Sequence, residues 1–142
     1  MDPNPLHILL VEDDEVETEA MLRTFQRQKF SYPLTIASNG LEALDLLRGE
    51  PDQAPLPQPY LILLDLDMPQ MNGLEFLQVL RSDPCLKQSV VFILTTSDRD
   101  EDKRAAYNQQ VAGYLLKSKV GTNFEPLIGL FNFYQQTVEF PH

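Results

Sequence analysis

Short apolar runs alternate along this chain with longer segments of helical periodicity. The apolar runs predict strands at residues 6–11, 34–37, 60–64, 90–94 and 113–116. Helical spacing of apolar residues predicts helices at residues 14–29, 41–48, 71–81, 99–110 and 123–136. Residues 50–59 contain four prolines and predict an exposed, rather stiff loop.

The regular order of strand then helix predicts an α/β fold with a parallel sheet. The strands are apolar without strict alternation, as expected where helices cover both faces. In such sheets the ligand site lies beyond the carboxyl ends of the strands. The residues that follow each strand are therefore the first candidates for chemistry.

Composition narrows the class of protein. The 142 residues fit one domain, expected to span 1–142, and the net charge of −10 disfavours general binding to nucleic acid or anionic membranes. A single cysteine, Cys85, excludes an internal disulfide. No signal peptide or membrane-length apolar run is evident, so we expect a cytoplasmic protein with no membrane partner.

Polar side chains follow four of the predicted strands, where one edge of the sheet would bring them together. Polar residues commonly follow strands, so any one of these side chains needs no functional explanation. Their occurrence after four strands in this order is not explained in that way. The set comprises Glu12, Asp13 and Asp14, then Asp65 and Asp67, then Thr95, Thr96 and Ser97, then Lys117 and Ser118.

Clustered carboxylates repel one another unless a cation lies among them. Oxygen ligands favour a hard ion, of which Mg²⁺ is the obvious candidate where phosphate is involved. A carboxylate can also attack phosphorus and carry an aspartyl phosphate. A nearby lysine and hydroxyl would hold the phosphoryl oxygens.

Four segments carry a resemblance to a known family: VEDD at 11–14, DLDMPQMNG at 65–73, LTT at 94–96 and GYLLK at 113–117. In this order they resemble the response-regulator receiver domain of two-component signalling. The resemblance implies a flavodoxin-like, doubly wound fold with strand order 2-1-3-4-5. It also implies a phosphoacceptor signalling protein rather than an enzyme.

The resemblance implies roles for individual residues. Asp65 would be the phosphoacceptor. Glu12 and Asp13 would hold Mg²⁺ together with Asp65 and the backbone carbonyl of Asp67.

Further implied roles concern the phosphoryl group and its readout. Thr95 would bond the phosphoryl group, Lys117 would pair with it, and the rotamer of Tyr114 would follow Thr95. More narrowly, GLEFL, TTSDRDEDK and GYLLKSKVG resemble the small regulators of cyanobacterial phytochrome histidine kinases. A sensor histidine kinase of that type is the partner this implies.

Two positions depart from the usual receiver pattern. Asp67 stands where many receivers have an amide or another residue. Ser118 follows Lys117 where proline is usual, which leaves the shape of the loop after the fifth strand open.

Two other functions are compatible with parts of the pattern. Asp65-Leu66-Asp67 after an apolar strand also opens the motif of haloacid-dehalogenase-type phosphatases, although there it follows the first strand of the core. A receiver that binds partners without being phosphorylated is the other alternative, and the intact set of Glu12, Asp13, Asp65, Thr95 and Lys117 argues against it.

The last helix carries apolar residues on two faces. Phe124, Leu127, Ile128, Phe131 and Tyr134 have core spacing, whereas Leu130 and Phe133 lie on another face. Either the C-terminal segment covers this second face, or another protein does. We expect a homodimer through the last helix and the fifth strand.

Overall fold

The computed structural model describes residues 5–68 and 70–141 as alternating strands and helices. In chain order the elements are β1 (His7–Val11), α1 (Glu15–Arg27), β2 (Leu34–Ala37), α2 (Gly40–Arg48), β3 (Tyr60–Leu64), α3 (Gly73–Ser82), β4 (Val90–Thr95), α4 (Asp100–Asn108), β5 (Gly113–Leu116), α5 (Lys117–Val120) and α6 (Glu125–Thr137).

The strands form one parallel sheet in the order β2-β1-β3-β4-β5. This order confirms the predicted doubly wound topology. The direction of winding reverses between β1 and β3, so the carboxyl ends of these two strands lie side by side at the switch point. Val11, the last residue of β1, is in register with Leu64, the last residue of β3.

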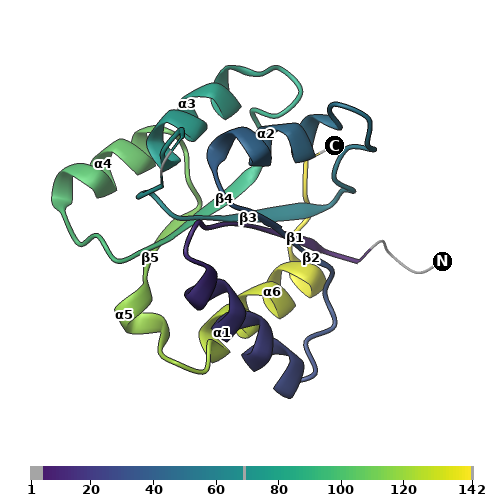
Figure 1. The fold of residues 1–142 in the computed structure, drawn as a ribbon, viewed down its shortest axis with the longest axis vertical. Helices are drawn as coiled ribbons and strands as arrows, with labels where there is room; N and C mark the ends of the chain where they lie inside the picture. The colour runs from purple at the N-terminus through teal and green to yellow at the C-terminus, as the bar shows by residue number, and fades with distance from the viewer. Residues whose placement is uncertain (1–4, 69, 142) are drawn as a thin grey trace.

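Helices cover both faces of the sheet: α2, α3 and α4 on one, and α1, α5 and α6 on the other (Figure 1). Alternate strand residues serve the two layers, as the pleat requires. In β1, Leu9 and Val11 face the first layer, whereas Ile8 and Leu10 face the second. Burial on both faces explains why the strands read as continuous apolar runs.

Every predicted strand and helix is present, with ends that differ by up to two residues, and the largest difference lies near the C-terminus. The sequence predicted no helix at α5, which is a single turn directly after β5. The last helix begins two residues later than predicted, at Glu125 with Pro126 in its first turn. None of the helices in the described part of the chain has both the length and the apolar character that a membrane crossing requires.

The two faces predicted for the last helix are covered unequally. Leu127 and Phe131 are buried as expected, with 1% and 0% of their surface exposed. Leu130, predicted for the second face, is partly buried against the same core. Phe133 remains 57% exposed. The second apolar face is therefore smaller than the sequence indicated.

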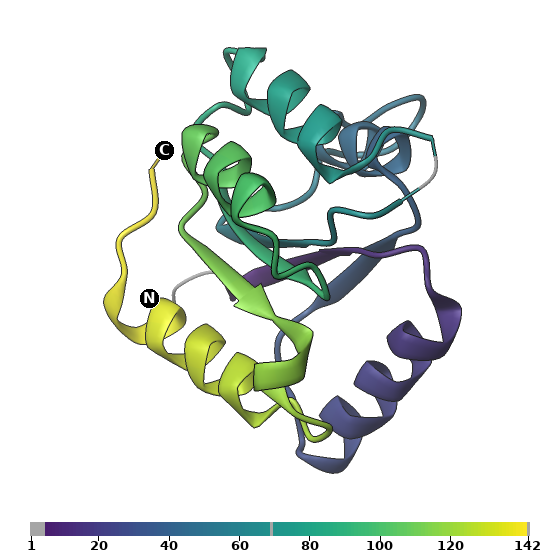
Figure 2. The same cartoon turned by 90° about the vertical axis from the view of Figure 1, so that its left-hand side faces the viewer.

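The C-terminal segment runs from α6 across the end of the sheet towards the α3–α4 layer (Figure 2). Phe140 packs against Tyr134, with ring centroids 5.8 Å apart. Pro141 lines a cavity of about 310 Å³ together with Pro84 and Cys85, which follow α3. This segment covers part of the last helix but leaves Phe133 open.

Candidate functional site

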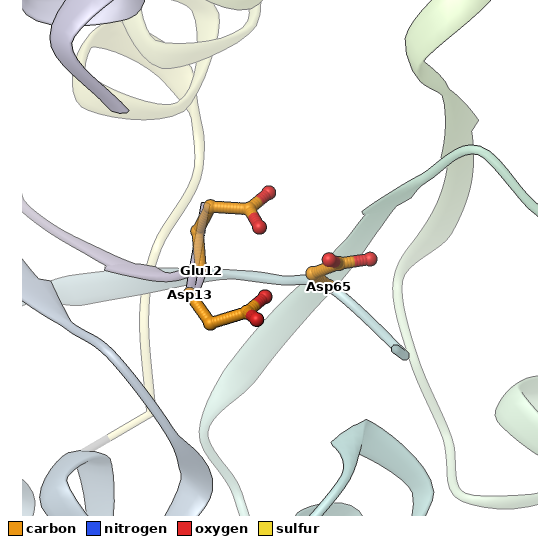
Figure 3. Close-up of side chains that lie close together, drawn as sticks. All are labelled: Glu12, Asp13 and Asp65. Carbon is orange, nitrogen blue, oxygen red and sulfur yellow. The ribbon is translucent and has the colours of Figure 1, made fainter. Parts of the chain in front are cut away.

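Three carboxylates predicted to act together do meet at the switch point. Glu12 and Asp13 follow β1, and Asp65 follows β3. Each offers an oxygen such that all three oxygens lie within 4.8 Å of one another. Glu12 and Asp13 leave the backbone in opposite directions, and both carboxylates turn towards Asp65 (Figure 3). Glu12 and Asp65 are buried, at 6% and 7% exposure, whereas Asp13 is open to solvent.

Asp14, the third acid of this run, has a different task. Its carboxylate caps α1 by accepting hydrogen bonds from the backbone N–H groups of Val16 and Glu17, at 2.9 and 3.2 Å. The cap satisfies donors that the first helical turn leaves without intrahelical partners. Of the three consecutive acids, Glu12 and Asp13 therefore belong to the carboxylate cluster, and Asp14 caps α1.

A glycine lets α3 approach the end of β3 closely. The Cβ of any larger residue at Gly73 would lie 2.5 Å from the carbonyl oxygen of Asp65 and 2.8 Å from Cα of Leu66. Asn72 caps α3 in a reciprocal capping box with Glu75. The Asn-Gly pair therefore fixes how α3 closes over the end of β3.

Burial dominates the electrostatics of Glu12. It raises the pKa of that carboxyl from 4.5 to about 7, against the opposing hydrogen bond from Lys117. The charge on Asp65 adds to the rise. A cation placed among the three carboxylates would relieve this unfavourable concentration of negative charge.

Lys117, the first residue of α5, reaches back to the carboxylates from the end of β5. Its Nζ lies 2.6 Å from Glu12 Oε1, 2.6 Å from Glu17 Oε2 and 3.7 Å from Asp65 Oδ2. Burial alone would lower the pKa of this ammonium, but the hydrogen bonds to Glu12 and Glu17 outweigh burial and raise it. Lys117 therefore stays protonated beside Asp65.

The hydroxyl and the aromatic residue are linked through the loop after β4. Thr95 is fully buried, and its Oγ1 lies 3.5 Å from the backbone nitrogen of Ser97. The Tyr114 hydroxyl donates to the carbonyl oxygen of Ser97 at 2.9 Å. One residue, Ser97, thus connects the predicted phosphoryl-binding hydroxyl to the predicted switch aromatic.

The two departures from the receiver pattern differ in consequence. The Asp67 side chain is exposed, and its backbone nitrogen lies 3.5 Å from Asp65 Oδ1. Ser118 lies within α5, so the loop in question is one helical turn that ends at Gly121, where φ is +85°. Residues 117–120 therefore carry Lys117 into the site without a proline.

The donor set fits a hard divalent cation. Its three side chains are carboxylates, whose oxygens favour ions such as Mg²⁺ or Mn²⁺ over soft metals. Sequence reasoning did not identify Glu17, the second partner of Lys117. The one available signal was its spacing, one helical turn beyond Asp13, and acids are common in a first helical turn for other reasons.

Comparison with known families gives one extended match. Residues 8–123 match the response regulator receiver domain. Response regulator Rcp1 of Synechocystis sp. is 34% identical over 138 residues, which cover 96% of this chain and 94% of Rcp1.

Solved structures agree with the sequence match. The Mn²⁺-bound form of response regulator Rcp1 superposes with a TM-score of 0.80 at 32% identity, over 98% of this chain and 100% of that one. The phosphorylated cyanobacterial phytochrome response regulator RcpA has a TM-score of 0.80 at 28% identity, over 96% of this chain and 98% of that one.

Proposed function

The chain belongs to the response regulator receiver domain family, and on that premise we propose that it is a phosphorylation switch with Asp65 as acceptor. It is a response regulator similar to the phytochrome response regulators Rcp1 and RcpA. The observation that carries the proposal is the position of Asp65. This buried carboxylate lies at the switch point, with Lys117 Nζ 3.7 Å away and the Glu12 and Asp13 carboxylates beside it.

The proposed metal is Mg²⁺, held by Glu12, Asp13, Asp65 and the backbone carbonyl of Asp67. When bound, it would supply positive charge that offsets the repulsion among the carboxylates and the incoming phosphoryl oxygens. Support comes from the all-oxygen donor set and from the Mn²⁺-bound structure of Rcp1.

In phosphoryl transfer the protein contributes mainly by positioning the reacting groups and by stabilising the charge on the phosphoryl oxygens. A carboxylate oxygen of Asp65 attacks phosphorus, and the bond from phosphorus to the donor's imidazole nitrogen breaks with its electron pair leaving on nitrogen. Lys117 pairs with a phosphoryl oxygen, and the Thr95 hydroxyl donates to another. Water later attacks phosphorus, which releases inorganic phosphate and restores the carboxylate.

Phosphorylation would be read out through Thr95 and Tyr114. If the Thr95 hydroxyl turns towards the phosphoryl group, its contact with Ser97 changes. Tyr114 already bonds to the carbonyl of Ser97, so its ring would respond. The response would appear at β5, which carries Tyr114, and at α4, which packs beside β5.

The proposed phosphoryl donor is a sensor histidine kinase of the phytochrome type. We propose that the two proteins interact in the cytoplasm. Its support is that RcpA is named as a phytochrome response regulator and is similar over 96% of this chain. Residues 1–142 would act as one receiver domain that turns over only its own acyl phosphate. Such a protein is not an enzyme towards other substrates.

We also propose that the chain forms a homodimer through α6 and β5. The support is Phe133, a large aromatic residue that is 57% exposed on α6. The exposed area is small for a whole interface, so β5 and Tyr114 would have to contribute.

Phosphotransfer tests the function directly. An autophosphorylated phytochrome-type histidine kinase should lose its label to this protein, and an Asp65→Asn variant should not accept it. Continuous hydrolysis of a small phosphomonoester without a stable labelled protein would instead favour a phosphatase. Binding to the kinase with no transfer under any condition would favour a phosphorylation-independent binding module.

A further inference from the structure

Lys117 is held by two glutamates, and they differ in what else they contact. Glu12 lies in the carboxylate cluster, and its other oxygen accepts a hydrogen bond from the Asp14 backbone at 3.2 Å. Within the described part of the chain, the Glu17 carboxylate hydrogen-bonds only to Lys117. Glu12 therefore takes part both in the carboxylate cluster and in the contact with Lys117, whereas Glu17 takes part only in the contact with Lys117.

The backbone that carries Glu17 is well anchored. Glu17 lies in the first turn of α1, and its N–H is bonded to the cap residue Asp14. The cap fixes the start of the helix next to the carboxylate cluster. Glu17 can thus hold an ammonium group at a defined place without itself joining the cluster.

The surroundings strengthen this ion pair. The Lys117 side chain is 16% exposed and that of Glu17 is 41% exposed. Both line a cavity of about 290 Å³ whose wall is mainly apolar. The Lys117 end of the pair is largely removed from solvent, so the attraction between the charges is screened less than between two fully exposed groups. The apolar wall is formed by Leu10, Met21, Leu94, Val120 and Phe124.

We propose that Glu17 is a positioning residue that keeps Lys117 beside Asp65 while Glu12 is engaged by a cation. This inference rests on the proposed function, because it concerns the same acceptor. Without Glu17, the ammonium has Glu12 as its remaining close partner and would compete with a cation for that carboxylate. Lys117 would then be less available to a phosphoryl oxygen at Asp65.

Glu17→Gln tests this, because the amide keeps the shape of the side chain and removes its charge. With Mg²⁺ and acetyl phosphate, the variant should label Asp65 roughly fivefold more slowly than the parent, the effect of one partly exposed charged hydrogen bond. Glu19→Gln, an exposed change of equal charge on the same helix, should label at the parental rate. Glu17→Asp should recover part of the loss.

A second readout needs no phosphorylation. Titration with Mg²⁺, followed by thermal stability, should half-saturate at a higher concentration in Glu17→Gln than in Glu19→Gln. In a Lys117→Ala background, Glu17→Gln should have no further effect on either measurement, because the residue through which it acts is gone.

The outcomes separate this inference from the function it rests on. If the parent is labelled at Asp65 but Glu17→Gln behaves like Glu19→Gln, the role of Glu17 is wrong and the switch stands. An equal effect of Glu17→Gln with and without Lys117 also overturns it, since Glu17 would then act in another way. A parent that is not labelled at Asp65 overturns both.

Discussion

Lys117 Nζ donates a hydrogen bond to Glu12 Oε1 across 2.6 Å, although the two residues are 105 positions apart in the chain. This contact joins the ends of β5 and β1 beside Asp65. It places a lysine proposed to bind phosphoryl oxygens on a carboxylate proposed to bind the metal. The pair therefore has to open, at least in part, for both roles to be filled.

The first prediction concerns the stability of the metal-free protein. Because the pKa of Glu12 rises from 4.5 to about 7 on folding, the folded state binds this proton more tightly than the unfolded state. The free energy of unfolding should therefore fall as pH rises from about 4.5 to 7. Glu12→Gln lacks this titration. Its free energy of unfolding should therefore rise relative to that of the parent as pH increases across that range, by on the order of 1–3 kcal/mol.

Urea denaturation in EDTA at several pH values measures this difference. Well below pH 4.5 the carboxyl is protonated in both states, so the difference between parent and variant should be constant there. If the two proteins show parallel stability curves from pH 4.5 to 7, Glu12 does not titrate as described.

The second prediction concerns the metal. Mg²⁺ should raise the unfolding free energy of the parent, because it binds the native carboxylate cluster. Asp13→Asn removes one of its three carboxylates and should raise the half-saturating concentration roughly tenfold, equivalent to about 1.4 kcal/mol. Asp52→Asn removes the same charge from an exposed loop and should leave the titration unchanged. Identical titrations for the two variants would exclude Asp13 as a ligand.

Much of the fold could be predicted from the sequence because the strands are buried on both faces. Continuous apolar runs ended by acids locate β1 and β3 to within one residue. The ends of the helices were harder to predict than the positions of the strands. The prediction began α3 at Met71, but the helix starts at Gly73, because Asn72 is the cap and Met71 has a positive φ of 76°. A single turn such as α5 is too short to show any periodicity.

The candidate site was predictable where family motifs mark it and not where contacts cross between elements. The motifs indicated the carboxylates, Thr95 and Lys117. The Glu17–Lys117 ion pair joins residues 100 positions apart. The link from Tyr114 to Thr95 runs through the backbone of Ser97, which any residue except proline can supply. The partial burial of Leu130 likewise depends on how α6 rotates against the sheet, which two overlapping apolar stripes do not determine.

The third prediction concerns Asp67. Its exposed carboxylate follows Asp65, the proposed acceptor, by two residues, and we expect it to orient the water that attacks the acyl phosphate. Asp67→Asn should therefore lose its phosphoryl group more slowly than the parent, by roughly threefold or more, well short of the full effect of a general base. The decay of labelled protein after donor removal measures this. Decay as fast as in the parent, or faster, means that Asp67 acts mainly by repulsion.

The fourth prediction concerns assembly. Phe133→Asp places a charge in the proposed α6 interface and should shift the protein from dimer to monomer in sedimentation at tens of micromolar. Leu41→Asp is a matched control, since Leu41 is 50% exposed on α2, away from α6. Labelling of Asp65 should be unchanged in both variants. A parent that sediments as a monomer with and without phosphodonor has no such interface.

The most direct test asks whether Asp65 is the residue that becomes phosphorylated. After incubation with Mg²⁺ and acetyl phosphate, peptide mapping by mass spectrometry should find one alkali-labile phosphoryl group, on Asp65. The isosteric Asp65→Asn variant keeps the fold of the site but lacks the nucleophile, so that peptide should carry no label. Efficient labelling that maps to another residue, or that persists in Asp65→Asn, would contradict the account.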